Sequence, residues 1–339
     1  MKILYLGNKK KKNENNPTGL DTLSIQLGSF FDVESRSDKK NRIFRLIDMV
    51  VAIIINRKRV NYVLIDTYSS KGFYFALICS FFCITFKKKY ILILRGGNLE
   101  SRLKKNKHLS KILFKKSYSN IAPSLFMHDI FKKYGFKTKY IPNNIIISKY
   151  KFKPRLKISS PKILWVRSFH KIYNPQMAIN VFKRVLHTYE GAELCMVGPK
   201  KDNSYEKCIK LARELGIKDR VTFTGKLEKK EWTSLSNNYN IFINTTNVDN
   251  LPVSVIEAMA LGLPVVSTNA GGLKYLHKNE SDALLVNCND ISSMSDKIIS
   301  IIENPALSKK LSENGFKKAK DFDWEIVKKA WKSLFLKVC

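Results

Sequence analysis

Two carboxylates flank an expected helix start in the segment DNLPVSVIEAMALGLPVVSTNAGG, residues 249–272. The pattern predicts a short helix that begins at Pro252 and ends at Gly262, with Asp249 before it and Glu257 about one turn inside. A proline suits a helix start, because the amide that it lacks would have no partner there. The positive end of a helix attracts negative charge. The question is therefore what the two acids do at a helix end that could also receive an anionic ligand.

The residues that lead into this helix are expected to receive phosphate on their backbone amides, at the positive end of the helix dipole. They are Asn250, Leu251, Pro252 and Val253. The acids would then accept hydrogen bonds from neutral hydroxyl groups, Glu257 from a ribose and Asp249 from a sugar, which fits a nucleotide sugar. Gly271 and Gly272 would let the backbone approach that ligand closely. The residues alone leave an alternative equally open, in which Asp249 caps the helix and Glu257 is a solvated helix acid.

Two cations follow the first strand of the second half. The run ILWVRSFHK places Arg167 at the carboxyl end of that strand and Lys171 four residues later, on the side where parallel sheets bind ligands. A guanidinium fork and a mobile ammonium suit a diphosphate. His170 lies between them and is the one histidine expected near such a ligand. The alternative is that these are solvated cations among the 61 Lys and Arg of the chain.

Strands must position these residues, and strand-like runs alternate with helical patterns along the chain. The expected strands are 2–7, 62–66, 90–95, 119–124 and 139–142, and then, from residue 162, KILWVR, AELCMVG, RVTFTG, NIFINTT, PVVST and ALLV. This alternation predicts parallel sheets covered by helices on both faces. The stretch 148–162 has the Pro, Ser and charge content of a linker. The expected fold class is therefore α/β, with two doubly wound, Rossmann-like domains and a ligand cleft between them.

The 339 residues are strongly and unevenly basic. The chain holds 61 Lys and Arg against 28 Asp and Glu, a formal charge of +33. Residues 1–158 contribute 34 against 9, or +25, and the rest contributes 27 against 19, or +8. This asymmetry favours an anionic partner for the first half. The six cysteines have no C-x-x-C pair and no regular spacing, which predicts reduced thiols.

Two basic segments, 102–117 and 130–140, interleave Lys with Leu, Ile, Phe and Tyr. An interfacial helix on anionic lipid has this composition, and a surface that binds single-stranded nucleic acid needs similar residues. Ordinary amphipathic helices with Lys-rich outer faces have it too. The apolar stretch 73–86 is too short to span a bilayer, so a buried helix that precedes a strand is expected there.

The segment 249–272 resembles the signature of retaining glycosyltransferases of family 4, which have the two-domain GT-B fold. That signature contains a Glu, seven residues, a second Glu and then Ala-Met-Ala-x-Gly-x-Pro-Val-Val. The resemblance continues through NPTGLDTLSIQL, APS, IPN, the Arg–Lys pair and VTFTG. It implies an acceptor-binding domain over 1–155 and a donor-binding domain over 156–321, with a C-terminal helix over 322–339 that packs back on the first domain.

The resemblance also implies roles for single residues. Glu257 would bind the nucleotide ribose, Arg167 and Lys171 the donor diphosphate, and Asp249 the donor sugar. Gly19, in the first loop of the acceptor domain, would lie near the phosphates across the cleft. No side chain is assigned as catalytic base, because retaining transfer of this type is often proposed to use the leaving phosphate to deprotonate the acceptor.

The chain departs from the family pattern in three places. Asp249 stands where the first Glu is usual, and the Arg–Lys spacing is one residue tighter. Where many members have His-Gly, this chain has LRGGN, so Arg95, Gly96 and Gly97 are possible ligand contacts, or Arg95 is structural.

The run DFD, 321–323, has the spacing of a metal-binding Asp-x-Asp. It directly precedes an amphipathic pattern, so Asp323 is expected to cap the last helix. Neither a metal nor another cofactor is expected.

The resemblance implies a retaining enzyme that moves a sugar from a nucleotide-diphosphate sugar to a saccharide or lipid-linked acceptor, in capsule, O-antigen or exopolysaccharide assembly. It would be cytoplasmic and peripheral to the inner face of the cytoplasmic membrane, with an anionic lipid surface and no nucleic acid as partner. One alternative is a sucrose-phosphate-type synthase with a soluble acceptor. The other is a non-catalytic GT-B-like protein that binds an anionic lipid surface or nucleic acid.

Overall fold

Short apolar runs form the strands of two parallel sheets, as expected. The computed structural model describes residues 1–9 and 18–336. The first sheet contains β1 (Lys2–Leu6), β2 (Asp32–Arg36), β3 (Tyr62–Thr67), β4 (Lys89–Leu94), β5 (Ser119–Ala122) and β6 (Lys139–Tyr140), in the spatial order β2-β1-β3-β4-β5-β6. The sequence analysis missed β2, because its residues, DVESR, are polar and the strand lies at the sheet edge.

The second sheet repeats this architecture with a new strand order. It contains β7 (Lys162–Val166), β8 (Glu193–Val197), β9 (Val221–Gly225), β10 (Ile241–Asn244), β11 (Val265–Thr268) and β12 (Leu284–Val286), in the order β12-β11-β10-β7-β8-β9. Every strand pair in both sheets is parallel. The expected class, α/β with two Rossmann-like sheets, is confirmed.

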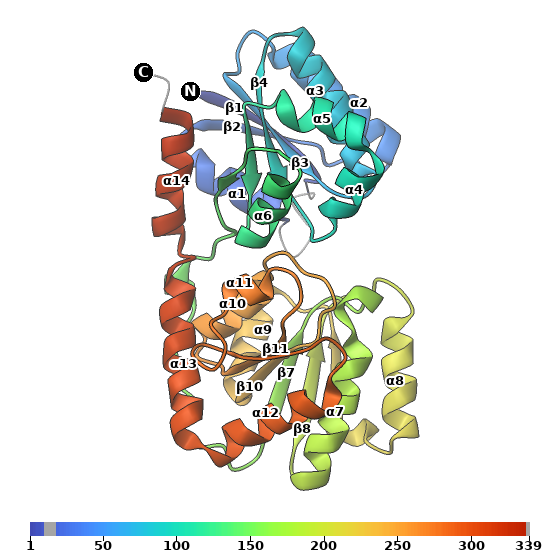
Figure 1. Cartoon of the computed structure of the whole chain (residues 1–339), viewed down its shortest axis with the longest axis vertical. Coiled ribbons are helices and arrows are strands. Elements are labelled where there is room, and N and C mark those ends of the chain that lie inside the picture. The colour runs from blue at the N-terminus through green and yellow to red at the C-terminus, as the bar shows by residue number, and fades with distance from the viewer. Residues whose placement is uncertain (10–17, 337–339) are drawn as a thin grey trace. The chain divides into compact units, whose positions relative to one another are not determined.

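Helices cover both faces of each sheet (Figure 1). Around the first sheet they are α1 (Gly19–Gly28), α2 (Arg42–Asn56), α3 (Gly72–Thr85), α4 (Leu99–Lys105), α5 (Lys107–Lys115) and α6 (Leu125–Lys133). Thr18 and Asp21 begin α1 with a capping box, in which each side chain bonds the other residue's backbone N–H. The stretch 73–86 forms α3, the expected helix before β4, although only one of its faces is buried.

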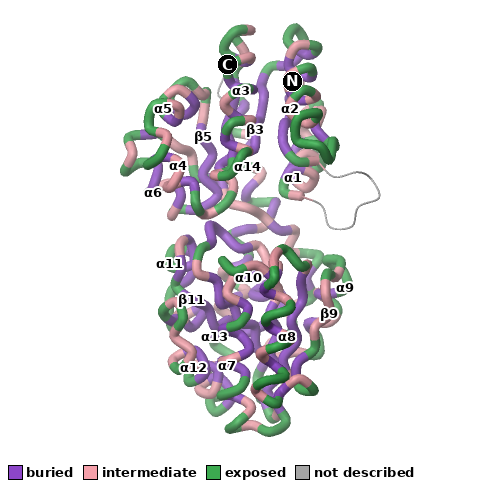
Figure 2. Tube along the Cα trace, turned by 90° about the vertical axis from the view of Figure 1, so that its right-hand side faces the viewer, coloured by how far each residue is buried: buried purple, intermediate pink, exposed green. Residues whose placement is uncertain are grey.

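Around the second sheet the helices are α7 (Pro175–Thr188), α8 (Ser204–Glu214), α9 (Lys229–Leu235), α10 (Val253–Ala260), α11 (Leu273–Leu276), α12 (Ile291–Glu303), α13 (Pro305–Lys320) and α14 (Trp324–Leu336). Single 3-10 turns lie at Ile147–Lys149, Lys171–Tyr173, Lys218–Arg220 and Ser236–Asn238. Figure 2 shows central strands such as β3 and β11 buried, while the helices alternate between buried and exposed residues, which is the pattern of a sheet enclosed by amphipathic helices. The edge strands β2, β6 and β9 are more exposed.

The chain divides into two compact units, Met1–Pro142 and Asn143–Cys339, so the boundary falls earlier than the expected 155/156. The predicted linker 148–162 is wrong. Arg155 is buried, and its guanidinium donates to the carbonyl oxygens of Tyr239 at 2.9 Å and Ser236 at 3.0 Å. Burial lowers the pKa of Arg155 to about 10. This stretch therefore belongs to the second unit. The linker prediction failed because it relied on composition, which does not show that Arg155 is buried.

Asp323 directly precedes α14, and its carboxylate accepts a hydrogen bond from the N–H of Ile147 at 3.2 Å. Capping of α14 by that carboxylate stays a prediction. The other acid of the DFD run, Asp321, pairs with Lys318 at 3.2 Å. The packing of α14 on the first domain stays a prediction. Most of the basic run 9–16 and Cys339 lie outside the described residues.

The basic segments 102–117 and 130–140 bury their apolar side chains. Leu103, Leu113, Phe114, Ile130 and Phe131 all belong to the core of the first unit. The interfacial-helix interpretation of these segments is therefore wrong, because membrane contact needs exposed apolar groups. They are ordinary amphipathic helices with lysines outside.

Exposed apolar residues lie instead on α2 and α3. On α2 they are Ile43, Phe44, Ile47, Val51 and Ile55, and on α3 they are Tyr74, Ile78, Phe81 and Ile84. We call this set the α2–α3 apolar surface. The opposite face of α2 is buried through Met49, Ala52 and Ile53, so the helix is apolar on two sides. Among the described residues, no helix has both the length and the apolar character needed to cross a membrane.

Candidate functional site

The carboxyl ends of β7 and β10 lie together, because these strands pair in the middle of the second sheet. The loops that follow them interlock. The N–H of Asn247 donates to the carbonyl of Ile172 at 2.8 Å, and the hydroxyl of Thr245 donates to that of Tyr173 at 2.9 Å. The segment that carries Arg167 and Lys171 is thereby fixed against the segment that carries Asp249. This is the edge at which doubly wound sheets bind ligands.

Arg167 and Asp249 form an ion pair at this edge. The Arg167 guanidinium also lies over the ring of Tyr173, 4.3 Å from its centroid, which fixes the plane of the group. Its buried Nε atom has no hydrogen-bond partner in the described part of the chain. The sequence predicted both charged residues at the site but not their pairing. Arg167 is thus positioned by protein contacts, while one buried donor of its guanidinium is left unsatisfied by them.

Lys171 begins a 3-10 turn that Asp202 holds in place. The carboxylate of Asp202 accepts hydrogen bonds from the N–H of Lys171 at 3.0 Å and of Ser204 at 2.9 Å. Burial raises the pKa of Asp202, but hydrogen bonds from Ser204 and Lys171 and the proximity of His170 outweigh it and lower that pKa to about 2. No local pattern pointed to Asp202, because it follows a different strand, β8.

The side chains beside this turn differ in freedom. His170 accepts a hydrogen bond at Nδ1 from the N–H of Ile172 at 3.2 Å, while its Nε2 lies 3.9 Å from Asp202. The exposed ammonium of Lys171 has no ion-pair or hydrogen-bond partner in residues 1–9 and 18–336. Lys171 therefore remains available to an anion, whereas His170 mainly shapes the turn.

Glu257 is buried on α10, so the alternative of a solvated helix acid is wrong. Its Oε1 atom accepts a hydrogen bond from the hydroxyl of Tyr150 at 2.8 Å and forms an ion pair with Lys229, with 2.6 Å between the charged atoms. Burial and the neighbouring Glu257 raise the pKa of Tyr150, which stays a hydrogen-bond donor. The sequence analysis missed Tyr150, because it lies in the stretch interpreted as a linker.

The expected helix begins at Val253, one residue later than predicted. Pro252 is its N-cap residue, with φ −72° and ψ 112°, and no side chain caps the helix end. The N–H of Asn250 donates to Asp249 at 2.8 Å, and the carbonyl of Leu251 accepts from Asn143 at 3.2 Å. The first-turn amides of α10 therefore form a positive end without a side-chain cap.

Two glycines support this helix end from behind. A Cβ atom on Gly271 would overlap the carbonyl oxygen of Asp249, and one on Gly272 would overlap that of Asn250. The N–H of Gly272 donates to the carbonyl of Asp249 at 3.0 Å. The close approach predicted at these glycines is therefore made by the chain's own backbone, which lets the segment 249–250 pack tightly.

The remaining predicted residues belong to the first unit. Arg95 directly follows β4, and its guanidinium donates to Asp66 at 3.0 Å and to the hydroxyl of Tyr5 at 2.9 Å. A Cβ atom on Gly19, the first residue of α1, would lie 3.1 Å from that guanidinium. Gly96 follows with φ 80°, and Gly97 continues the turn. Arg95 is thus held by partners within its own sheet.

The site of the second unit combines chemically different groups at one strand edge. It offers a fixed guanidinium, a free ammonium, an uncapped helix end and a buried carboxylate, at Arg167, Lys171, Val253 and Glu257. Cationic groups and helix amides bind phosphates, and a carboxylate accepts hydrogen bonds from hydroxyl groups. The arrangement suits a ligand that has both.

Comparison with known proteins places this geometry in a family. A model described as glycosyl transferases group 1 matches residues 147–318, just over half of the chain. Protein CapJ of Staphylococcus aureus is 26% identical over 285 residues, which cover 78% of this chain and 69% of CapJ. The lipopolysaccharide core biosynthesis glycosyltransferase LpsD of Rhizobium meliloti is 32% identical over 137 residues, 40% of this chain and 38% of LpsD. The chain spans half or less of the length of several curated relatives.

A solved structure extends the likeness to the whole chain. Anabaena HepE, in complex with UDP-glucose, has a TM-score of 0.76 and 17% identity, with 98% of this chain and 99% of HepE covered. At that identity the likeness concerns the fold alone. It confirms the expected GT-B arrangement of two Rossmann-like domains.

Proposed function

The chain belongs to the glycosyl transferases group 1 family, and we propose that it is a retaining family 4 glycosyltransferase with a nucleotide-diphosphate sugar as donor. The observation that carries this proposal is the position of Glu257. A buried carboxylate follows an uncapped helix end within one helix, beside the Arg167–Asp249 pair. The complex of Anabaena HepE with UDP-glucose supports the same donor class.

The phosphates of the donor would meet the cations of the site. Arg167 and Lys171 bind the diphosphate, together with the first-turn amides of α10 near Val253. These groups stabilise the negative charge that develops on the leaving nucleoside diphosphate. Gly19, Arg95, Gly96 and Gly97 belong to the first unit, and a contact of any of them with the donor remains part of the proposal.

The hydroxyl groups of the donor would meet the carboxylates. Glu257 accepts from the ribose and Asp249 from the transferred sugar. Tyr150 orients Glu257 through its 2.8 Å hydrogen bond, and the side chain of Lys229, which is 51% exposed, moves aside for the ligand. Asp249 reaches less far than a glutamate, because its side chain is one methylene shorter.

The transfer retains the configuration of the sugar. The bond from the anomeric carbon to the phosphate oxygen breaks, and a bond from that carbon to the acceptor oxygen forms on the same face. The acceptor proton passes to an oxygen of the leaving phosphate. The proposal includes no metal and no other cofactor, so chelation of divalent ions is expected to leave activity unchanged.

The acceptor is proposed to be a saccharide or a lipid-linked saccharide of the cell envelope. The similarity to LpsD, a lipopolysaccharide core biosynthesis glycosyltransferase, supports this class. We place the protein in the cytoplasm, at the inner face of an anionic membrane, with the α2–α3 apolar surface as the contact. Exposed cations lie at both ends of α2, with Lys39 and Lys40 before it and Arg57, Lys58 and Arg59 after it. Apolar groups flanked by cations suit anionic lipid.

Vesicle binding tests the membrane part of the proposal. Binding to vesicles that contain phosphatidylglycerol is expected to exceed binding to neutral phosphatidylcholine vesicles and to fall as salt rises. The variant with Phe44→Ser and Ile47→Ser is expected to lose most of this binding, while Leu156→Ser, an exposed apolar residue of the second unit, keeps it. Equal binding by both variants would reject the α2–α3 apolar surface as the contact.

A thermal-shift panel tests the donor site. Wild type and Glu257→Ala are measured with UDP, GDP, ADP and several of their sugar conjugates. Stabilisation by one nucleotide family is expected, and it should weaken by about 1–3 kcal/mol in binding free energy in the variant, because a hydrogen-bonding charge is lost. The control is Glu190→Ala, an exposed acid of the same unit. Absence of any shift at millimolar nucleotide would contradict the enzyme proposal and favour a non-catalytic binding protein.

A further inference from the structure

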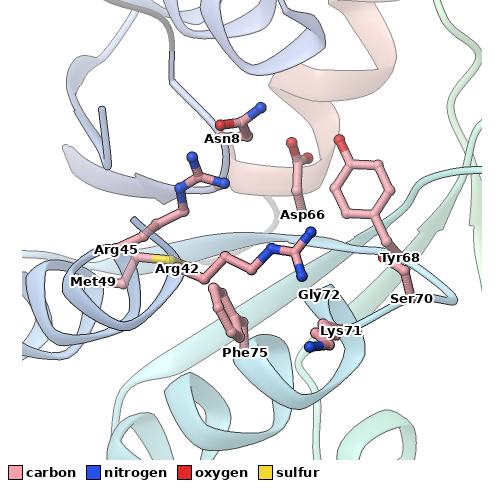
Figure 3. A pocket seen from close by; sticks show the side chains of 11 residues that line it. Asn8, Arg42, Arg45, Met49, Asp66, Tyr68, Ser70, Lys71, Gly72 and Phe75 are labelled. Atoms are coloured by element: carbon pink, nitrogen blue, oxygen red, sulfur yellow. The ribbon is translucent and has the colours of Figure 1, made fainter. Parts of the chain in front are cut away.

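A cationic pocket lies at the carboxyl edge of the first sheet, wholly within the first unit. Its volume is about 360 Å³, within the range of roughly 300–1,000 Å³ that small-molecule sites occupy. Figure 3 shows its lining. Gly7 and Asn8 come from the end of β1, Asp66 and Tyr68 from the end of β3, and the rest from α2 and the start of α3.

Three cations line this pocket, Arg42, Arg45 and Lys71. Arg45 donates to the carbonyl oxygen of Lys39 at 2.9 and 2.7 Å, so its guanidinium has a fixed position near Asn8 (Figure 3). In the described part of the chain, the side chains of Arg42 and Lys71 have no ion-pair or hydrogen-bond partner. Two unpaired cations thus accompany a positioned one around a single cavity.

Asp66, the one carboxylate among the described lining residues, does not neutralise these cations. It accepts hydrogen bonds from Arg95 at 3.0 Å and from the hydroxyl of Tyr5 at 2.9 Å. The charge of Asp66 is therefore balanced by Arg95, which lies outside the lining. The pocket keeps a net positive charge, and such a concave site concentrates anions.

The other walls are suited to an organic ligand that carries the anion. Met49 and Phe75 supply apolar surface, and Tyr68 presents a partly exposed ring. Asn8 and Ser70 can exchange hydrogen bonds with hydroxyl groups. A bare inorganic ion would use the cations but not these walls. The lining therefore fits a phosphate or phosphodiester group attached to a sugar or a lipid chain.

We propose that this pocket binds a phosphate group of the acceptor, so that the acceptor of this glycosyltransferase is phosphorylated. The inference rests on the proposed function only in naming the ligand as the acceptor. Binding of the phosphate itself depends on Arg42, Arg45 and Lys71 and on none of the residues assigned to the donor. The source of the phosphate is either a soluble sugar phosphate or a lipid-linked phosphate.

The test measures binding of the full-length chain at constant ionic strength by calorimetry. The probes are glucose 6-phosphate, glucose, and a polyprenyl phosphate in detergent micelles, with empty micelles as blank. At least one phosphorylated probe is expected to bind, and glucose and the empty micelles are not. Arg42→Gln and Lys71→Gln should each weaken that binding about tenfold, the scale for one charge-assisted hydrogen bond near a surface.

Matched variants separate this pocket from general charge and from the donor site. Lys107→Gln and Lys111→Gln remove exposed cations of the same unit and should bind like wild type. Both lysines lie on α5, which contributes no residue to the lining of the pocket. Arg167→Ala should also bind the phosphorylated probe like wild type, although it loses UDP.

The source of the phosphate follows from which probe Arg42→Gln weakens. Weakened binding of glucose 6-phosphate indicates a soluble sugar phosphate, and weakened binding of polyprenyl phosphate indicates a lipid-linked phosphate. Failure of both probes to bind overturns the proposal, as does equal weakening by Arg42→Gln and Lys111→Gln. If Arg167→Ala loses probe binding while Arg42→Gln and Lys71→Gln keep it, the phosphate binds in the second unit, and the proposal is overturned. Failure of the donor proposal would instead be seen as absence of UDP binding with phosphate binding intact.

Discussion

Each sheet carries an arginine directly after a strand that is paired with an aspartate, yet the two pairs differ. Arg95 and Asp66 have 14% and 2% of their side chains exposed, and Tyr5 donates to the same carboxylate oxygen. Arg167 and Asp249 are 21% and 10% exposed. In the described residues, the buried Nε of Arg167 has no hydrogen-bond partner.

This difference separates an ion pair whose groups are held by several partners from one that is less buried and lies in the proposed donor site. Burial opposes the charge of Arg95, but Asp66, Tyr5 and Tyr68 together hold its pKa well above the usual value. Burial also raises the pKa of Tyr5, so its hydroxyl stays a donor. In the second unit the pair lies beside an uncapped helix end and the free Lys171. The same two residue types thus form a buried pair with a third partner in one sheet, and a more exposed pair at the proposed donor site in the other.

The largest expected effect comes from removing each arginine in turn. Arg95→Met leaves Asp66 buried without its charge partner and should destabilise the first unit by about 3–5 kcal/mol. Arg167→Met should destabilise the second unit less, by about 1 kcal/mol, because that pair is more exposed. Asp249 also still accepts the hydrogen bond from the N–H of Asn250. Hydrogen exchange of β1, β3 and β4 reports the first unit. Hydrogen exchange of β7, β8 and β10 reports the second.

The proposed difference between the two ion pairs is contradicted if Arg95→Met leaves hydrogen exchange of the first unit unchanged. It is also contradicted if Arg167→Met destabilises the second unit as much as Arg95→Met destabilises the first. Weaker UDP binding by Arg167→Met, with unchanged uridine binding, would assign Arg167 to the phosphates.

A glycine of the second site gives the next largest effect. Gly272→Ala would place a methyl group on the carbonyl oxygen of Asn250 and displace the segment that carries Asp249. We expect a loss of about 1–3 kcal/mol in stability from overpacking, together with weaker nucleotide binding. Gly28→Ala is the matched control, because no heavy atom lies within 4 Å of its added Cβ. Urea unfolding measures the stability of the two variants, and UDP titration measures their affinity. Equal stability and equal affinity would show that the loop packing has no effect on the site.

Acid stability tests how Asp202 holds the turn of Lys171. The folded pKa of Asp202 is about 2, below its usual 3.8, so the carboxylate stabilises the fold above about pH 4 and loses this contribution as the pH falls towards 2. Asp202→Asn should remove this part of the pH dependence, at most about 2 kcal/mol. The exposed Asp219→Asn serves as control in urea unfolding between about pH 5 and pH 2. Parallel pH profiles of Asp202→Asn and wild type would refute this role.

The smallest effect is expected at Tyr150. Tyr150→Phe removes one hydrogen bond to Glu257 and should weaken UDP binding by about 1 kcal/mol, less than Glu257→Ala does. Tyr205→Phe, whose ring packs on Phe169 in the same unit, should bind UDP like wild type. If Tyr150→Phe also binds UDP like wild type, the hydrogen bond from Tyr150 is not needed to orient the carboxylate of Glu257.

The sequence by itself determined the elements of this protein. Eleven strand-like runs, from KILYLG to ALLV, predicted eleven of the twelve strands in the described part of the chain, because buried parallel strands are recorded as local apolar runs. The polar edge strand β2 left no such signal. The end of α10 at Gly262 was also readable, since this residue has φ 78° and a left-handed turn there favours glycine. The residues of the proposed donor site were chosen from equally local patterns, and their roles remain predictions.

The tertiary structure decided which of these residues meet. Arg167 and Asp249 are 82 positions apart and Tyr150 and Glu257 are 107 apart, and both pairs depend on the packing of distant segments. No local pattern records such a partner, so Tyr150 was hidden in an apparent linker. Periodicity shows which face of an element is buried, but strand order and loop packing determine which polar groups share that buried space.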